Sequence, residues 1–249
     1  MGTIVSDFDG TLCFDGRTIA PDIVAALERT HVAHRLVIAS ARPPRDLRPV
    51  LPESLADVAI VGGNGAFAVH GHTQVVRHLD PTTRNAIDAL IAAHGLRAHI
   101  DGDGDYAYTG DGTDAVIAKV HTHGPEKAVA ASSLPGYTKV VLFTTAPTVL
   151  AAVRDLPVTV TVHGGEGLLD ISPAGVDKAS ALAHLGIGPG EYVAIGNDHN
   201  DAPLFRAAHH SVCVGDNPVG VAATERVRPA DVAATLDRLA QLADMASAA

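Results

Sequence analysis

The sequence IVSDFDGTL, residues 4–12, leads from an apolar stretch into a pair of carboxylates. Apolar or small residues run up to Asp7 and Asp9, and the chain then turns at Gly10. Residues two apart on an extended chain point the same way, so these two acids can face one pocket. Because burying charge is costly without a partner, the stretch is either a solvated surface turn or a pair of acids that share a ligand.

The composition of the 249-residue chain is that of an ordinary globular protein, with 47% hydrophobic and 18% charged residues. Its formal charge is −10, from 28 acidic and 18 basic residues, and it contains no basic run. Such a chain is poorly suited to gripping a nucleic-acid backbone, so we expect no nucleic-acid partner. Small anionic substrates are compatible with this charge, because a pocket can be locally positive inside an acidic protein.

The cysteines and the N-terminus indicate a reducing compartment. Cys13 and Cys213 lie outside any C-x-x-C pattern, and we expect both to be buried free thiols. The first residues lack the basic segment of a signal peptide, and no apolar run reaches the roughly 20 residues of a membrane span. The sequence therefore predicts a cytoplasmic protein with no membrane partner.

The first third of the chain alternates strand and helix patterns. Short apolar runs predict strands, and helical spacing with an early proline predicts the helices between them. In chain order these are strand 3–9, helix 21–31, strand 35–41, helix 44–53 and strand 58–66. This alternation predicts a parallel sheet with helices on its faces.

The middle of the chain changes character after an expected hairpin that turns at Gly71. Several short strands follow with few helices between them, which indicates an inserted α+β domain over residues 80–166. Its expected elements are helix 81–95, strands 97–101, 106–110, 115–123 and 138–145, helix 146–156 and strand 158–164.

The last part returns to the alternating pattern and is expected to complete the parallel sheet. Its expected elements are strand 167–173, helix 175–186, strand 191–197, helix 200–210, strand 211–215 and a closing helix 229–246. The core domain is therefore predicted to consist of residues 1–79 and 167–249, an α/β fold interrupted by the α+β insertion.

Polar side chains follow the strand ends, where ligands bind in open parallel sheets. Asp7 and Asp9, together with acids among residues 197–201, would form an oxygen cage suited to Mg²⁺. A phosphate beside that metal needs donors, which Ser40, Lys178 and the backbone N–H groups of Phe8 to Gly10 would supply. Two acids at one metal can also divide the work of nucleophile and proton donor.

Five stretches, in this order, resemble the motifs of the haloacid dehalogenase superfamily. They are SDFDGTL, ARPPRDL, GGNGAFAV, DISPAGVDKASAL and IGNDHNDAPLF. With the insertion after the third strand, they are most similar to the Cof-like type IIB branch. The resemblance spans about 160 residues and implies a Rossmann-like core with an inserted α+β cap of type C2B that closes over the pocket and decides the substrate.

The resemblance implies a role for each matching residue. Asp7 would be the nucleophile that forms an aspartyl-phosphate, and Asp9 would protonate the leaving alcohol and then activate water. Phosphate would be held by Ser40, Lys178 and the backbone N–H groups of Phe8 and Gly10, and Asn200 would either order the loop or contact phosphate. Mg²⁺ would be bound by Asp7, the backbone carbonyl of Asp9, Asn197 and Asp201. The pocket would be lined by Thr11, Arg42, Asn64 and Asp198.

The chain departs from the family pattern at two positions. Asn197 stands where the family usually has Asp, which removes one formal charge and should weaken Mg²⁺ binding. The neighbouring Asp198 is a candidate to compensate, and His199 lies in the same loop. Ala41 stands where the family favours Gly, which predicts a tighter or shifted loop before Arg42.

Some of these residues also have ordinary structural interpretations. Ser40 is a candidate helix N-cap, Lys178 an exposed helix residue and Asn197 a turn residue. The favoured function is a Mg²⁺-dependent phosphatase, monomeric or homodimeric, acting on a small phosphorylated metabolite such as a sugar phosphate. The alternatives are a phosphomutase or phosphotransferase of the same superfamily and a non-catalytic metabolite-binding protein.

Overall fold

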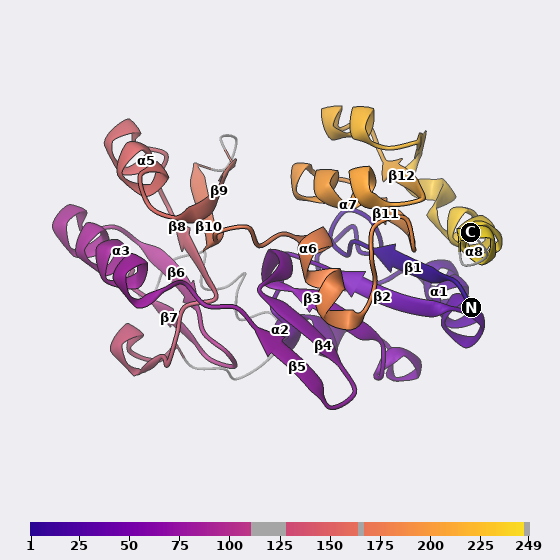
Figure 1. The fold of residues 1–249 in the computed structure, drawn as a ribbon, viewed down its shortest axis with the longest axis horizontal. Helices are drawn as coiled ribbons and strands as arrows, with labels where there is room; N and C mark the ends of the chain where they lie inside the picture. Colours follow the sequence, from indigo (N-terminus) through magenta and orange to yellow (C-terminus); the bar gives the residue numbers. More distant parts are fainter. Residues whose placement is uncertain (111–127, 164–166, 247–249) are drawn as a thin grey trace. The chain divides into compact units, whose positions relative to one another are not determined.

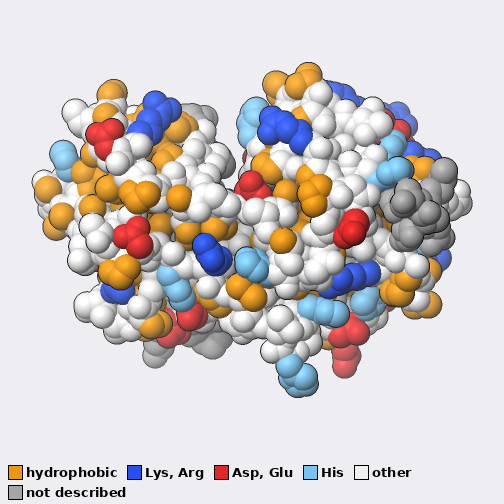
Figure 2. Space-filling view, viewed as in Figure 1, with side chains coloured by type: hydrophobic (Ala, Val, Ile, Leu, Met, Phe, Trp, Pro, Cys, Tyr) orange, Lys and Arg blue, Asp and Glu red, His pale blue; other side chains and the backbone are white. Residues whose placement is uncertain are grey.

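The computed structural model describes residues 1–110, 128–163 and 167–246, and their contacts divide the chain into two compact units. One unit consists of Met1–Val75 and Asp177–Ala249, and the other of Val76–Val176. Among the described residues, no helix is both long and apolar enough to cross a membrane. On the face drawn in Figure 2, basic side chains are dispersed among acidic and uncharged ones.

The first unit is built on an eight-stranded sheet with the order β13-β12-β11-β1-β2-β3-β4-β5. Neighbours from β13 to β3 are parallel, whereas β3 and β4 are antiparallel. The strands are β1 (Thr3–Ser6), β2 (Arg35–Ala39), β3 (Ala59–Gly62), β4 (Phe67–His70), β5 (Thr73–Val76), β11 (Val193–Gly196), β12 (His210–Val214) and β13 (Glu225–Val227). The mostly parallel sheet expected from the sequence is confirmed.

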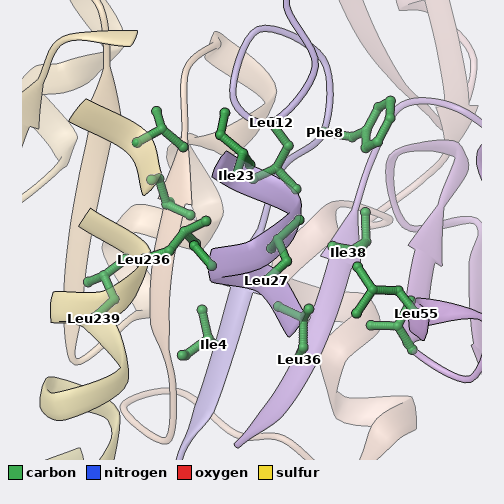
Figure 3. Packing of buried hydrophobic residues seen from close by; sticks show 14 of the residues in the cluster. Ile4, Phe8, Leu12, Ile23, Leu27, Leu36, Ile38, Leu55, Leu236 and Leu239 are labelled. Carbon is green, nitrogen blue, oxygen red and sulfur yellow. The ribbon is translucent and has the colours of Figure 1, made fainter. Parts of the chain in front are cut away.

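Helices cover both faces of this sheet, because its strands are apolar on both sides (Figure 1). On β1, Ile4 belongs to the cluster formed with α1 (Pro21–Ala33) and α8 (Val232–Ala246), as shown in Figure 3. The next residue, Val5, belongs to the opposite cluster with α6 (Lys178–Leu182) and α7 (Ala202–Ala207). The short α2 (Pro44–Leu47) follows β2. The buried sheet therefore provides a rigid base for the loops at its carboxyl edge.

The second unit is built on an antiparallel five-stranded sheet with the order β7-β6-β8-β10-β9. Its strands are β6 (Ala98–Asp101), β7 (Tyr106–Tyr108), β8 (Lys139–Leu142), β9 (Val158–His163) and β10 (Leu168–Pro173). One face packs its apolar residues, such as Ile100 and Val140, against α3 (Pro81–His94) and α5 (Pro147–Arg154). The expected α+β character is confirmed, while the strand expected at 115–123 lies outside the described residues.

The strand expected at 167–173 was assigned to the wrong sheet. It forms β10, which pairs antiparallel with β8 and β9 in the second unit. The reason is the hairpin that β10 makes with β9, since six consecutive register pairs from Leu168 to Pro173 hold the two strands together. The parallel sheet resumes only with β11.

Candidate active site

The hydrogen bonding between β1 and β11 continues for one residue past the end of β1, to Asp7 in the candidate site. The N–H of Asp7 donates to the carbonyl of Ile195 on β11 over 2.8 Å. Phe8 is fully buried in the apolar cluster of α1 and α8 (Figure 3). Its carbonyl accepts from the N–H of Leu12 at 2.9 Å. A buried aromatic anchor therefore separates Asp7 from Asp9 and fixes the turn that follows.

Lys178 lies at the centre of the site, with its ammonium fully buried between two carboxylates. Its Nζ donates to Oδ1 of Asp7 at 2.7 Å and to Oδ1 of Asp201 at 2.6 Å. Lys178 is the first residue of α6, whose N-cap Asp177 forms a capping box with Ser180. The helix start thus points this lysine into the carboxylates, and the exposed-residue interpretation of Lys178 is wrong.

The charges of this cluster do not balance, because one ammonium faces two carboxylates. Burial, followed by the like charge of Asp201, raises the pKa of Asp7 to about 7, although Lys178 and Thr11 act in the opposite direction. Burial disfavours the charged form of Lys178, but the two carboxylates outweigh it and raise the pKa of its ammonium. When Asp7 is ionised, the site therefore holds surplus negative charge that an added cation would stabilise.

Asp201 holds the loop after β11 in place with both of its oxygens. Oδ1 accepts from Lys178, and Oδ2 accepts from the backbone N–H groups of Asn197 at 2.9 Å and Asp198 at 3.0 Å. Its carboxyl group packs where a side chain at position 196 would lie, since a Cβ on Gly196 would sit 2.6 Å from it. In this arrangement Asp201 organises the loop, and its role as a metal ligand stays a prediction.

The Asn197 side chain reaches three oxygens of the β1 loop. One corner of its amide lies 3.0 Å from Oδ2 of Asp7, 2.9 Å from the carbonyl of Asp9 and 3.2 Å from Oγ1 of Thr11. Thr11 gives its own proton to Oδ2 of Asp7 at 2.9 Å, so all three oxygens are acceptors toward Asn197. The hydrogen-bond network therefore assigns the amide nitrogen to this corner.

The side chains of Asp198 and His199 lie outside the hydrogen-bond network of Asp7, Lys178 and Asp201. The Asp198 carboxylate accepts from the N–H of His199 at 2.7 Å and from Nδ2 of Asn217 at 3.0 Å. It caps the 3₁₀ turn His199–Asp201, and the His199 side chain is exposed. Asp198 thus has a local structural role in this loop. In this arrangement its carboxylate does not replace the negative charge that Asn197 lacks.

The carboxylate of Asp9 is held by Arg42, a partner that the sequence did not reveal. Nε of Arg42 donates to Oδ2 of Asp9 at 2.8 Å, and Nη2 donates to Oδ1. The same Nη2 donates to the carbonyl of Gly16 at 2.9 Å, and the guanidinium lies 5.1 Å from the centre of the Phe8 ring. The Asp9 side chain, although 43% exposed, is thereby fixed in one orientation by its bidentate pair with Arg42.

Ser40 and the Gly-rich turn after β3 support the site from the other side. Ser40 is fully buried and accepts from the N–H of Arg42 at 3.1 Å, while its carbonyl accepts from the N–H of Asn64 at 3.0 Å. Asn64 adopts a left-handed conformation with φ of 56°, and its side chain accepts from Asn200 at 3.1 Å. Asn200 in turn accepts from Lys178 at 3.3 Å. These bonds bring three strand-end loops into one network.

The turn at Gly10 has a tighter geometry than the sequence indicated. Gly10 has φ of +76°, and a Cβ there would lie 2.2 Å from the Asn197 amide, so the position requires glycine. Its N–H donates to the carbonyl of Cys13 at 2.8 Å. Phosphate binding by this N–H, which stays a prediction, requires that bond to open.

Two residues that contribute to the site, Gly16 and Asn217, were not predicted from the sequence. Gly16 acts through its backbone carbonyl, for which the sequence carries no signal. Asn217 follows β12 at the same edge of the sheet, so the rule that ligands meet at strand ends was sufficient to find it.

The donor set of the site fits Mg²⁺ in its chemistry. Among the described residues, no group of three or more His, Cys, Asp or Glu is arranged to hold a metal ion. The three oxygens around the Asn197 amide, however, are hard donors gathered at one point beside surplus negative charge. A carboxylate, a backbone carbonyl and an amide are ligands that Mg²⁺ accepts.

The sequence comparison shows the family. Residues 4–225 match the profile described as haloacid dehalogenase-like hydrolase, and the chain belongs to this family. The resemblance seen in the motifs is thereby confirmed. No curated protein sequence matches the chain significantly.

Solved structures show the same fold over nearly the whole chain. The subclass IIB sugar phosphatase BT4131 has a TM-score of 0.80 at 18% identity, covering 97% of this chain and 99% of that one. The phosphatase BT1666 from Bacteroides thetaiotaomicron has a TM-score of 0.79 at 19% identity, with 97% and 94% covered. TM0651 from Thermotoga maritima has a TM-score of 0.80 at 21% identity, with 95% and 97% covered. The chain therefore has the fold of subclass IIB phosphatases.

Proposed function

We propose that this chain is a Mg²⁺-dependent phosphatase that hydrolyses a small phosphorylated metabolite through an aspartyl-phosphate on Asp7. The observation that carries the proposal is the buried Lys178 ammonium between Asp7 and Asp201. A structural ion pair needs one acid for one base, whereas this cluster has an acid in excess. A site that receives both a cation and a phosphoryl group needs such an arrangement.

The proposed reaction assigns two bond changes to the two acids at the end of β1. The carboxylate of Asp7 attacks phosphorus, the ester oxygen leaves, and Asp9 gives that oxygen a proton that it must first take up by releasing one of its bonds to Arg42. Asp9 then takes a proton from water, which attacks phosphorus, releases inorganic phosphate and restores Asp7. Each proton that Asp9 gives up in the first step returns to it in the second.

Other residues would position the phosphoryl group and the cation. Lys178 and Ser40 would face the phosphoryl oxygens, and Lys178 would also keep Asp7 in its attacking orientation. Mg²⁺ would be held by Asp7, the carbonyl of Asp9 and Asn197, where it would supply positive charge against the phosphoryl oxygens. The raised pKa of Asp7 supports this assignment, because a nearby cation would favour the ionised nucleophile.

The substrate class within this proposal is a sugar phosphate or a related phosphomonoester. It is supported by the fold shared with BT4131, which is described as a sugar phosphatase. The cap role expected for residues 80–166, the cytoplasmic location and the oligomeric state stay predictions from the sequence.

The test is phosphate release from a panel of phosphorylated sugars and one aryl phosphate, with Mg²⁺ and with EDTA. We expect turnover that EDTA removes, and none from Asp7→Asn. The matched control is Asp22→Asn, which makes the same change at an exposed position on α1 and should retain activity. Equal turnover by wild type and Asp7→Asn would sink the proposal, and transfer of phosphate to an added alcohol without release would favour a phosphotransferase.

A further inference from the structure

The Asn197 amide occupies the point at which the proposed metal ligands converge. Its nitrogen donates toward Oδ2 of Asp7 and the carbonyl of Asp9, at 3.0 and 2.9 Å. These are the two oxygens of the β1 loop that would coordinate Mg²⁺ in the proposed function. An N–H donor and a cation compete for the same lone pairs, so they cannot both be satisfied there.

The backbone around Asn197 is held in place, so exchanging the amide atom that faces Asp7 and Asp9 involves the side chain alone. The N–H of Asn197 donates to the buried carboxylate of Asp201 at 2.9 Å, which fixes the start of the loop. The amide lies directly over Gly10, where the absence of a Cβ leaves room for it. A half-turn about the last side-chain bond exchanges the nitrogen for Oδ1 without moving the backbone.

We propose that Asn197 acts as an internal stand-in for the metal: its amide nitrogen satisfies Asp7 and Asp9 in the metal-free protein, and turns away to present Oδ1 when Mg²⁺ binds. The inference rests on the proposed function for the identity of the cation. It assigns Asn197 a role that an aspartate at the same position cannot perform, because a carboxylate has no N–H to donate.

Compared with an aspartate at position 197, Asn197 should therefore make the metal-free site more stable and the binding of Mg²⁺ weaker. In the metal-free protein, an aspartate at 197 would bring a third carboxylate beside Asp7 and Asp201, with Lys178 as their one buried ammonium. Like charges at such distances repel strongly when they are shielded from water. With Mg²⁺ present, the same aspartate would add a charged ligand and bind the ion more tightly.

The experiment compares wild type, Asn197→Asp and Asn85→Asp by thermal unfolding in EDTA and by calorimetric Mg²⁺ titration. We expect Asn197→Asp to unfold at a lower temperature in EDTA, to bind Mg²⁺ at least about tenfold more tightly, and to gain more thermal stability from the ion. Asn85→Asp is the matched control, since it makes the same change at an exposed position on α3, and it should keep the wild-type Mg²⁺ affinity.

A second readout follows the rotation itself. The Asn197 side-chain N–H protons should exchange slowly with solvent in EDTA and faster once Mg²⁺ is added, as seen by NMR. Asn197→Asp with an unchanged unfolding temperature in EDTA, or with unchanged Mg²⁺ affinity, would overturn the inference. These measurements need no turnover, so a wild type that binds Mg²⁺ as expected but releases no phosphate would overturn the proposed function alone.

Discussion

Both units of the molecule bury a lysine among acidic groups, but they place these charges in different parts of a sheet. In the first unit, Lys178 meets Asp7 and Asp201, which come from loops at strand ends and lie far apart in the sequence. In the second unit, Lys139 on β8 pairs with Asp170 on the neighbouring β10 at 3.0 Å, both within strands. Strand ends can gather groups from many segments, whereas a strand interior offers only its register neighbours.

The charged groups within the strands of the second unit have a structural role. The polar groups of the second unit alternate with core residues, since Asp101 and Lys139 are register partners on the face opposite Ile100 and Val140. A regular two-residue period holds them rigidly on one face. The loops of the first unit instead bring one lysine between two carboxylates, the arrangement on which the proposed phosphoryl transfer rests.

Replacing each lysine by methionine should give the largest difference between the two units. Lys178→Met leaves two buried carboxylates without their cation and should lower turnover of an aryl phosphate on the order of 10²–10³-fold. Removing one partner of a buried pair also costs about 3–5 kcal/mol, so the variant should unfold at lower denaturant.

The matched variant is Lys139→Met, which should lose stability and keep the wild-type kcat on the same aryl phosphate. Urea unfolding and steady-state kinetics at a temperature where both variants are folded would compare them. A similar fall in kcat for the two variants would show that the two buried lysines do not differ in the way proposed.

Arg42 offers a sharper test within the first unit. If it positions Asp9 as proton donor, Arg42→Met should slow hydrolysis of alkyl phosphates by at least about tenfold, because general acid catalysis contributes roughly 10²–10⁴-fold there. Hydrolysis of p-nitrophenyl phosphate should change much less, since its leaving group departs without a proton. The two substrates are compared by kcat for Arg42→Met, Asp9→Asn and the double variant.

The double variant should be no slower than Asp9→Asn alone on the alkyl phosphate, because the arginine acts through the acid. Equal slowing of both substrates by Arg42→Met would instead indicate a direct contact with the phosphoryl group.

A smaller effect concerns the stability of the metal-free protein against pH. The folded state raises the pKa of Asp7 from 3.8 to about 7, so folded Asp7 keeps its proton where the unfolded chain releases it. Asp7 should therefore reduce stability as pH rises from about 4 to about 7, with no further change above that. Asp7→Asn removes this dependence and should be the more stable protein at pH 8 in EDTA.

Unfolding temperatures of wild type and Asp7→Asn across that pH range, with Asp22→Asn as control, would check the sign. Parallel curves for wild type and Asp7→Asn would show that the Asp7 carboxyl is not strained by its surroundings.

The sequence predicted the groups around Lys178 because each lies in a contiguous motif at a strand end. It did not predict the Arg42–Asp9 pair, since a motif gives a side chain's position along the chain and not its direction. The strand at 168–173 was misassigned for a related reason. An apolar strand before a helix has the same local pattern in either sheet, and only its pairing with β9 and with the more distant β8 decides between them.

The most direct test of the account is a search for a phosphoryl group on Asp7. Asp9→Asn, given p-nitrophenyl phosphate and Mg²⁺, should form the intermediate without needing a proton donor and then hydrolyse it slowly. Mass spectrometry of the quenched and digested protein should find one added phosphoryl group on the peptide that contains Asp7, and none in Asp7→Asn. An unmodified Asp7 in a variant that still releases phosphate would contradict the account.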